Sequence, residues 1–172
     1  MVLDHVDRIA YAAESDRTSP IALERFCTHF NYEPMAFRAS DGEGRAIYHT
    51  NVLMCIATDF ALIGSSMIED PARREDVLQR LTQSGRAIID LSDAQIGAFA
   101  GNAIELQGSE GRILALSETA LNALRPDQIS EISKSAKVVP LSIPTIELSG
   151  WSVRCTIAGI HLTARESGQP LT

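Results

Sequence analysis

Hydrophobic and polar positions along the chain repeat in one order, in which a short apolar strand precedes an amphipathic helix and a second apolar strand. The first unit predicts a strand at residues 8–13, a helix at 21–30 and a strand at 34–39. In the helix, Leu23, Phe26 and Phe30 share one face, which we expect to pack against a core. Ser19-Pro20 is expected to form a turn that leads into the helix.

Two further units repeat this order. The second predicts a strand at 60–65, a helix from Asp70-Pro71 to Thr82 with Gly85 as its stop, and a strand at 87–91. The third predicts a strand at 113–116, helices at 119–124 and 127–136, and a strand at 137–141. The equivalent apolar residues Ile9, Leu62 and Leu114 are 53 and 52 residues apart. Additional strands are predicted ahead of the units, at 2–4, 47–57 and 103–106, and a fourth at 145–148 ahead of a last short helix.

A strand-strand-helix-strand unit of about 52 residues cannot bury its own faces. The pattern therefore predicts an α/β chain whose units stack around a common centre or along an axis, with three full units and the start of a fourth. The first unit begins with Met1 already in a strand, so we expect an N-terminally incomplete domain over residues 1–162. Residues 163–172, rich in Thr, Ser, Gly, Pro and Gln, are expected to form a flexible tail.

Composition narrows the classes of partner. The 172 residues are 45% hydrophobic and 22% charged, which is typical of a globular domain. A net charge of −7 and a pI near 5 argue against nucleic-acid or anionic-membrane binding. The apolar runs fall short of the roughly 20 residues of a membrane span, and the N-terminus lacks the pattern of a signal peptide. We therefore expect a cytoplasmic protein with no nucleic-acid or membrane partner.

Two residues are candidates for chemistry. His49 lies just before the apolar stretch 52–57, where we expect a strand to end. Functional sites are commonly built at strand ends, and histidine can transfer protons near neutral pH. Cys155 follows a loop that contains Gly150, with Ser152 as a possible N-cap, which would put the thiol at the third helical position, where the helix dipole favours a thiolate. Arg154 adds positive charge. A partly buried histidine and a small packing cysteine are the alternatives.

The other cysteines are expected to pack. Cys55 lies in an apolar strand and Cys27 on the first helix, and an odd cysteine count in such a chain argues against disulfides. Cys27 and His29 point to different helix faces, so we expect no metal site. No phosphate-binding or hydrolase-elbow motif occurs, and we expect no cofactor.

Four motifs in order resemble the guanidino-group-modifying superfamily. They are Ser15-Asp16-Arg17-Thr18, Tyr48-His49-Thr50-Asn51-Val52, Phe99-Ala100-Gly101-Asn102 and the segment from Gly150 to Cys155. The chain is most similar to the arginine-deiminase-related branch, which includes the citrulline-utilisation hydrolases often labelled amidinotransferases. The resemblance covers essentially the whole chain and implies a pentein-type α/β-propeller of strand-strand-helix-strand blades around a central active site.

The resemblance also implies residue roles. Cys155 would be the nucleophile that attacks a guanidino or ureido carbon, and His49 the general acid and base. Arg17 would bind the substrate's α-carboxylate, although a surface arginine is the alternative. Asn51 occupies the place of a substrate-contacting Asp in deiminases. Asn102 matches a motif, and a turn or cap role is the alternative.

The chain departs from the family pattern before the cysteine, after it at Thr156 and Gly159, and at the start of the sequence. Relatives usually have a run of glycines before the cysteine, whereas here Trp151 follows Gly150. In relatives a catalytic carboxylate precedes the strand that opens this chain, and no such segment is present.

Two functions remain open. The first is a cysteine-dependent hydrolase or amidinotransferase that acts on arginine, citrulline or a related compound and is incomplete as written. The second is a catalytically inactive propeller remnant that acts as a binding or structural module. We expect self-association or a complementing N-terminal polypeptide as the partner, because an incomplete propeller exposes a strand edge.

Overall fold

Residues 1–159 are described by the computed structural model, and they form three small sheets of the same topology. In each sheet the first strand pairs antiparallel with the second, which pairs parallel with the third. The first sheet contains β1 (Val2–Asp4), β2 (Ile9–Ala13) and β3 (Glu33–Phe37). The second contains β4 (Met54–Ile56), β5 (Phe60–Ile63) and β6 (Ala87–Asp90). The third contains β7 (Ile104–Gly108), β8 (Gly111–Ser117) and β9 (Lys137–Leu141). The chain is therefore a mixed α/β protein with small sheets.

Helices connect the parallel strand pairs and the sheets. The helices are α1 (Pro20–Phe30), α2 (Thr50–Leu53), α3 (Pro71–Thr82), α4 (Asp93–Gly97), α5 (Glu118–Ala123), α6 (Pro126–Ile132) and α7 (Pro144–Glu147). Two 3₁₀ turns are η1 (Ser65–Met67) and η2 (Val153–Thr156). The Ser19 and Asp70 side chains cap α1 and α3, and the sequence predicts the second of these helix starts. Each of these helices has proline as its first residue.

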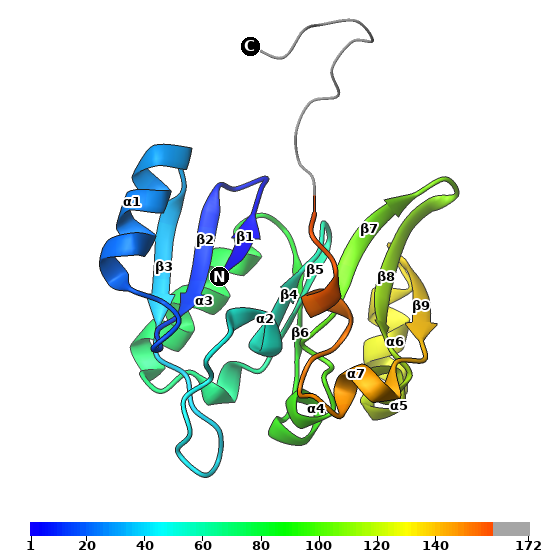
Figure 1. The fold of residues 1–172 in the computed structure, drawn as a ribbon. Helices are drawn as coiled ribbons and strands as arrows, with labels where there is room; N and C mark the ends of the chain where they lie inside the picture. The colour runs from blue at the N-terminus through cyan, green and yellow to red at the C-terminus, as the bar shows by residue number, and fades with distance from the viewer. Residues whose placement is uncertain (160–172) are drawn as a thin grey trace, which may run out of the picture.

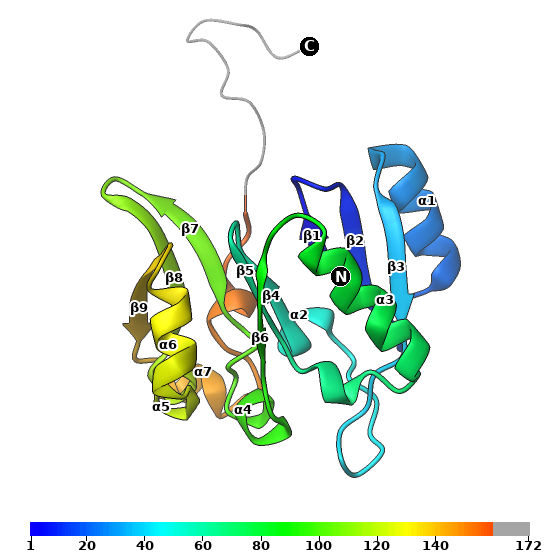
Figure 2. The same cartoon turned by 180° about the vertical axis from the view of Figure 1, so that it is seen from behind.

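The three sheets stand side by side in chain order (Figure 1). The first strands meet, because β1 contacts β4 and β4 contacts β7. Viewed from behind, α3 lies next to the first sheet and α6 next to the third (Figure 2). The short elements α2, α7 and η2 lie together at the front of the molecule (Figure 1). The segment that follows β3 and the segment that follows β9 therefore lie in the same region.

Helices also cover the outer strand of the preceding sheet. The third residue of α3, Arg73, donates from Nε to the carbonyl oxygen of Ala36 on β3 at 2.8 Å. The third residue of α6, Gln128, donates from Nε2 to the carbonyl oxygen of Asp90 on β6 at 2.9 Å. Two strand edges are thus covered in the same way, and each helix links two neighbouring sheets.

An ion pair joins the first two sheets at a buried position. Arg86 donates to both carboxylate oxygens of Asp4, at 2.7 and 3.1 Å, and the side chains are 3% and 1% exposed. Its Nε donates to the carbonyl oxygen of Ala57. A buried pair of this kind is tolerated because nearly every donor of the guanidinium has a partner.

The core runs through all three sheets. Its main cluster includes Ile9, Tyr11, Leu62 and Leu114, which are fully buried, so apolar residues of all three units share one core. The predicted stripe of α1 is wrong in part. Leu23 is buried, but Phe30 is 51% exposed, and Cys27 takes the inner position instead. Phe30 is the last residue of α1, and its ring packs on that of Phe26, with centroids 4.8 Å apart, so about half of its surface remains exposed.

The predicted strand at 47–57 is wrong in its first half. Residues Thr50–Leu53 form α2, and only Met54–Ile56 pair with β5. An apolar run does not distinguish a buried helical turn from a strand. The Thr50 hydroxyl, which accepts the Ala13 N–H at 2.9 Å, holds the helical turn against β2.

The predicted strand at 145–148 is also wrong, because residues Pro144–Glu147 form α7. Pro144 supplies the fixed φ that suits a first helical position. Leu148 is 90% exposed, so apolar residues in this segment are not necessarily buried.

Within residues 1–159 no helix is long and apolar enough to cross a membrane. The expected tail at 163–172 and the end of the expected domain at residue 162 lie outside the described residues.

Candidate functional site

Cys155 lies on the 3₁₀ turn η2, which packs against β8. Its thiol is partly exposed, whereas Val153 two residues earlier is 1% exposed and anchors the turn. The sequence predicts a helix start here with Ser152 as its cap. The turn is present with Cys155 as its third residue, but the Ser152 hydroxyl donates to Glu147 Oε1 at 3.3 Å instead of capping the turn. The turn is also 3₁₀ and four residues long, so a helix dipole adds little to the thiol's environment.

Two amide groups donate to the Cys155 sulfur. Asn102 Nδ2 lies 3.1 Å from Sγ and Asn51 Nδ2 lies 3.5 Å from it. Asn102 Nδ2 also donates to the Asn51 carbonyl oxygen at 2.8 Å, so the three residues form one connected group. Both N–H groups therefore point at the sulfur atom. The three predicted residues therefore meet at one point, although their motifs lie far apart in the sequence.

Asn102 is held deeply. The residue is 1% exposed, and its backbone oxygen accepts the Arg154 N–H at 3.3 Å. Its Oδ1 is buried without a hydrogen-bond partner among the described residues. A buried acceptor without a donor costs free energy, so a group with spare N–H donors would be favoured beside this amide.

Close backbone approach positions the Asn102 segment. A Cβ atom on Gly101 would lie 2.4 Å from the Val52 carbonyl oxygen and 2.9 Å from the Leu53 carbonyl carbon. Only glycine permits the 99–102 loop to lie this close to α2. Gly101 thus brings Asn102 against Asn51.

His49 precedes α2 at the N-cap position. Its ring contacts the rings of Tyr48 and Trp151, with centroids 4.7 and 5.4 Å away. Partial burial lowers the pKa of His49 below its ordinary value, and the positive charges of Arg17 and the Met1 ammonium lower it further. The imidazole is therefore neutral near pH 7. Within residues 1–159 no hydrogen bond joins His49 to Cys155.

Arg17 lies in an exposed turn beside the same loop. Its backbone N–H donates to Ser15 Oγ at 3.1 Å, and that hydroxyl donates to the Tyr48 carbonyl oxygen at 3.0 Å. The guanidinium is close enough to affect His49. Arg17 thus lies at the rim of the same region. Within residues 1–159 its guanidinium forms no ion pair with a carboxylate.

The other two thiols differ from Cys155. Cys55 on β4 is buried, and burial raises its pKa to about 12. Cys27 is 3% exposed inside α1, and burial raises its pKa as well. Both are packing residues, as their positions in the sequence suggest. Among the described residues no group of three His, Cys, Asp or Glu side chains could hold a metal ion.

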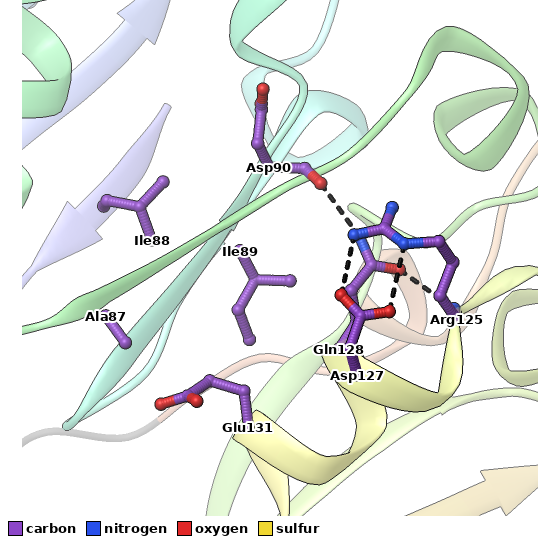
Figure 3. Close-up of a pocket in the computed structure, with 8 residues that line it drawn as sticks. All are labelled: Ala87, Ile88, Ile89, Asp90, Arg125, Asp127, Gln128 and Glu131. Carbon is purple, nitrogen blue, oxygen red and sulfur yellow. Dashed lines mark hydrogen bonds and ion pairs between the residues drawn. The ribbon is translucent and has the colours of Figure 1, made fainter.

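A separate surface pocket of about 560 Å³ lies between β6 and α6 (Figure 3). Its polar groups already have partners. Arg125 pairs with Asp127 at 3.0 Å, and Gln128 donates to the Asp90 carbonyl oxygen. The pocket shares no residue with the Cys155 group and belongs to the seam between two sheets.

A family model for N,N-dimethylarginine dimethylhydrolase, eukaryotic, matches residues 1–162. The chain belongs to this family. The match spans all four motifs and includes Cys155, His49, Arg17, Asn51 and Asn102. It places the chain among the guanidino-group-modifying proteins. No curated protein matches the chain.

Solved structures share the fold of this dimethylarginine dimethylhydrolase family member. ArgZ, an arginine dihydrolase from the ornithine–ammonia cycle in cyanobacteria, aligns with a TM-score of 0.70 at 15% identity over 90% of this chain and 23% of that one. The N-terminal domain of ArgZ bound to substrate aligns with a TM-score of 0.67 at 15% identity over 89% of this chain and 52% of that one. Unliganded AgrE aligns with a TM-score of 0.69 at 15% identity over 89% of this chain and 21% of that one. The chain thus spans about half of the ArgZ domain and under a quarter of the longer chains.

Two residues of this region have no role predicted from the sequence. Thr50 anchors α2, and Gly101 permits the close approach. Trp151, which the sequence marks as a departure from the family pattern, contacts His49. Their roles depend on contacts between distant segments, and the sequence does not report these.

Proposed function

We propose that this chain contains the part of a C–N hydrolase active site that includes the nucleophilic cysteine. The substrate is a guanidino or ureido group of arginine, citrulline or a related compound. The observation that carries the proposal is the pair of amide donors on Cys155 Sγ. Family membership supports the reaction class, and one ArgZ structure is described as covalently bound to a reaction intermediate.

Cys155 would act as the nucleophile. Its thiolate attacks the planar central carbon, and a C–S bond forms as the carbon becomes tetrahedral. The C–N bond to the leaving amine then breaks, and a covalent thiouronium-type intermediate remains. Water attacks this carbon, a proton is lost, and expulsion of the thiolate releases the product. When a guanidino group reacts, the products are an amine and a ureido group.

His49 would carry the protons of both steps. A neutral imidazole can accept a proton from the thiol or from the attacking water, and the protonated ring can give one to the leaving amine. The low pKa of His49 keeps it in the base form at neutral pH. Because no hydrogen bond to Cys155 is present, His49 would act on substrate groups that lie between the two side chains.

Arg17 would bind the α-carboxylate of an amino-acid substrate. Its charge has no carboxylate partner in the described chain, and its guanidinium suits bidentate carboxylate binding. Asn51 and Asn102 would orient the thiolate, and Asn51 would also contact the substrate.

The three sheets would be blades of a pentein-type α/β-propeller within a domain of residues 1–162. Their shared topology and the contacts among the first strands support this architecture. The citrulline-utilisation branch, transfer to an amine instead of water, and a cytoplasmic location are further proposals.

A non-catalytic binding module is the second candidate. Two observations favour it: no hydrogen bond joins His49 to Cys155, and the described residues place no carboxylate in hydrogen-bond contact with either side chain. The outer edge of β9 has exposed positions, including Leu141, that could meet a second copy or a complementing polypeptide. Sedimentation of the purified chain would reveal self-association.

Trapping of the thiol tests the catalytic proposal. The chain is incubated with 2-chloroacetamidine, a planar cation, and the adducts are mapped by mass spectrometry for wild type, Cys155→Ala, His49→Ala and Cys27→Ser. We expect one adduct on Cys155, slower formation in His49→Ala and an unchanged rate in Cys27→Ser. No adduct, or equal labelling of Cys27 and Cys55, would favour the non-catalytic module.

A further inference from the structure

Trp151 is the one tryptophan of the chain, and it is presented from an anchored loop. Before it, the Gly150 N–H donates to the Glu147 carbonyl oxygen at 2.9 Å, and Gly150 has a φ of 84°. After it, Ser152 and Val153 are each 1% exposed, and the Ser152 hydroxyl donates to Glu147. The indole is nevertheless 38% exposed. A large aromatic side chain is therefore held in place with part of its surface open to solvent.

Two contacts connect the Trp151 loop to the loop that carries His49. The rings of Trp151 and His49 lie 5.4 Å apart, with an angle of 40° between their planes. Asn51 Nδ2 lies 3.5 Å from Cys155 Sγ. The segments 49–51 and 151–155 are thus joined at both ends. The indole therefore contacts the imidazole and lies on the same loop as the thiol.

A cation bound beside these residues would have no carboxylate partner in hydrogen-bond contact with them. No carboxylate among residues 1–159 hydrogen-bonds to His49, Trp151 or Cys155, and Arg17 adds a positive charge at the rim. The face of an indole is electron-rich and attracts planar cations, whether or not a carboxylate is present. It also stacks on a flat group and so fixes its orientation.

We propose that Trp151 is a specificity-determining residue that binds the planar cationic head of the substrate on its exposed indole surface, beside His49. The inference rests on the proposed function and predicts that the exposed indole binds a planar cation in preference to a neutral planar group.

The test compares two alkylating agents on Cys155. The thiolate displaces chloride from 2-chloroacetamidine, a planar cation, and iodide from iodoacetamide, a neutral amide, and each reaction forms one C–S bond. Rates are measured by mass spectrometry for wild type, Trp151→Phe and Trp151→Leu, with thermal unfolding as the check on folding. We expect Trp151→Leu to react about five- to tenfold more slowly with chloroacetamidine and within about twofold of wild type with iodoacetamide. Trp151→Phe, which keeps an aromatic face, should retain most of the chloroacetamidine rate.

The outcomes separate this inference from the proposed function. Equal slowing with both reagents, or no slowing in Trp151→Leu, would overturn the role of the indole while a Cys155 adduct upheld the function. If wild-type Cys155 reacts with iodoacetamide and fails to react with chloroacetamidine, the proposed function and the inference both fail.

Intrinsic fluorescence gives a second readout that needs no activity. Because Trp151 is the one tryptophan and contacts His49, protonation of the imidazole should quench its emission. We expect the emission of wild type to titrate with a midpoint below about 6.5, the ordinary pKa of histidine. His49→Gln should abolish the titration, and His29→Gln, on α1, should leave it unchanged. The absence of any titration in wild type would remove the contact on which the inference depends.

Discussion

The Nδ2 atom of Asn102 lies 3.1 Å from the Sγ atom of Cys155, although 53 residues separate the two in the sequence. The same nitrogen donates to the backbone of Asn51, whose own side chain also reaches the sulfur. One buried amide therefore connects the two loops that meet at the thiol.

Replacement of Asn102 should slow alkylation of Cys155. Asn102→Ala removes the shorter of the two N–H donors, so the thiolate loses a favourable hydrogen bond and we expect a rate about tenfold lower, which corresponds to roughly 1.4 kcal/mol. Asn51→Ala removes the donor at 3.5 Å and should have a smaller effect. Iodoacetamide kinetics at pH 8 measures both. A larger loss in Asn51→Ala than in Asn102→Ala would contradict this order.

The three cysteines should differ in reactivity in the folded protein. Burial raises the pKa of Cys55 to about 12 and raises the pKa of Cys27, while Cys155 is partly exposed. We expect iodoacetamide at pH 8 to label Cys155 at least about tenfold faster than the other two. Peptide mapping measures the three rates. In urea the three rates should converge, which serves as the control.

Gly101→Ala should destabilise the fold and disturb the site. The added Cβ would lie 2.4 Å from the Val52 carbonyl oxygen, so either the 99–102 loop or α2 must shift. We expect a loss of about 1–3 kcal/mol in the free energy of unfolding and a slower alkylation of Cys155. Gly97→Ala is the matched control, because its Cβ meets nothing within 4 Å. That variant should be neutral or slightly more stable.

Removal of Arg86 should weaken the connection between the first two sheets. Arg86→Met leaves the Asp4 carboxylate, which is 1% exposed, without its counter-ion. We expect a loss of about 3–5 kcal/mol in the free energy of unfolding, measured by urea denaturation. Arg38→Met removes a pair whose arginine is 77% exposed, and should change stability by less than about 1 kcal/mol. Equal effects of the two variants would refute a structural role for the buried pair.

Stability should fall on acidification in part through His49. The pKa of His49 is lower in the folded protein than the ordinary value of about 6.5 in an unfolded chain. Its contribution is therefore fully present above about pH 6.5 and is lost as the pH falls through the folded pKa. His49→Gln lacks this titrating group. Below pH 6.5 the free energy of unfolding of wild type should therefore fall relative to that of the variant. Urea denaturation of both proteins from pH 5 to pH 8 measures it.

The sequence by itself determined the order of elements in each unit. Most strands, the helix start at Asp70 and the burial of Ile9, Leu62 and Leu114 follow from local pattern, because periodicity and capping act over a few residues. The motifs also marked the segments that carry Cys155, Asn51 and Asn102. Local pattern failed at 50–53, where an apolar run forms a helical turn, and at 144–147, where proline starts a helix that leaves Leu148 exposed.

Only the tertiary structure decided which side chains meet. The contacts of Cys155 with Asn102 and of His49 with Trp151 join segments about 50 to 100 residues apart, and the close approach at Gly101 permits the first of them. Such contacts depend on how three sheets pack against one another, which no local pattern encodes. The same packing buries Cys55 and leaves the Cys155 thiol partly open to solvent.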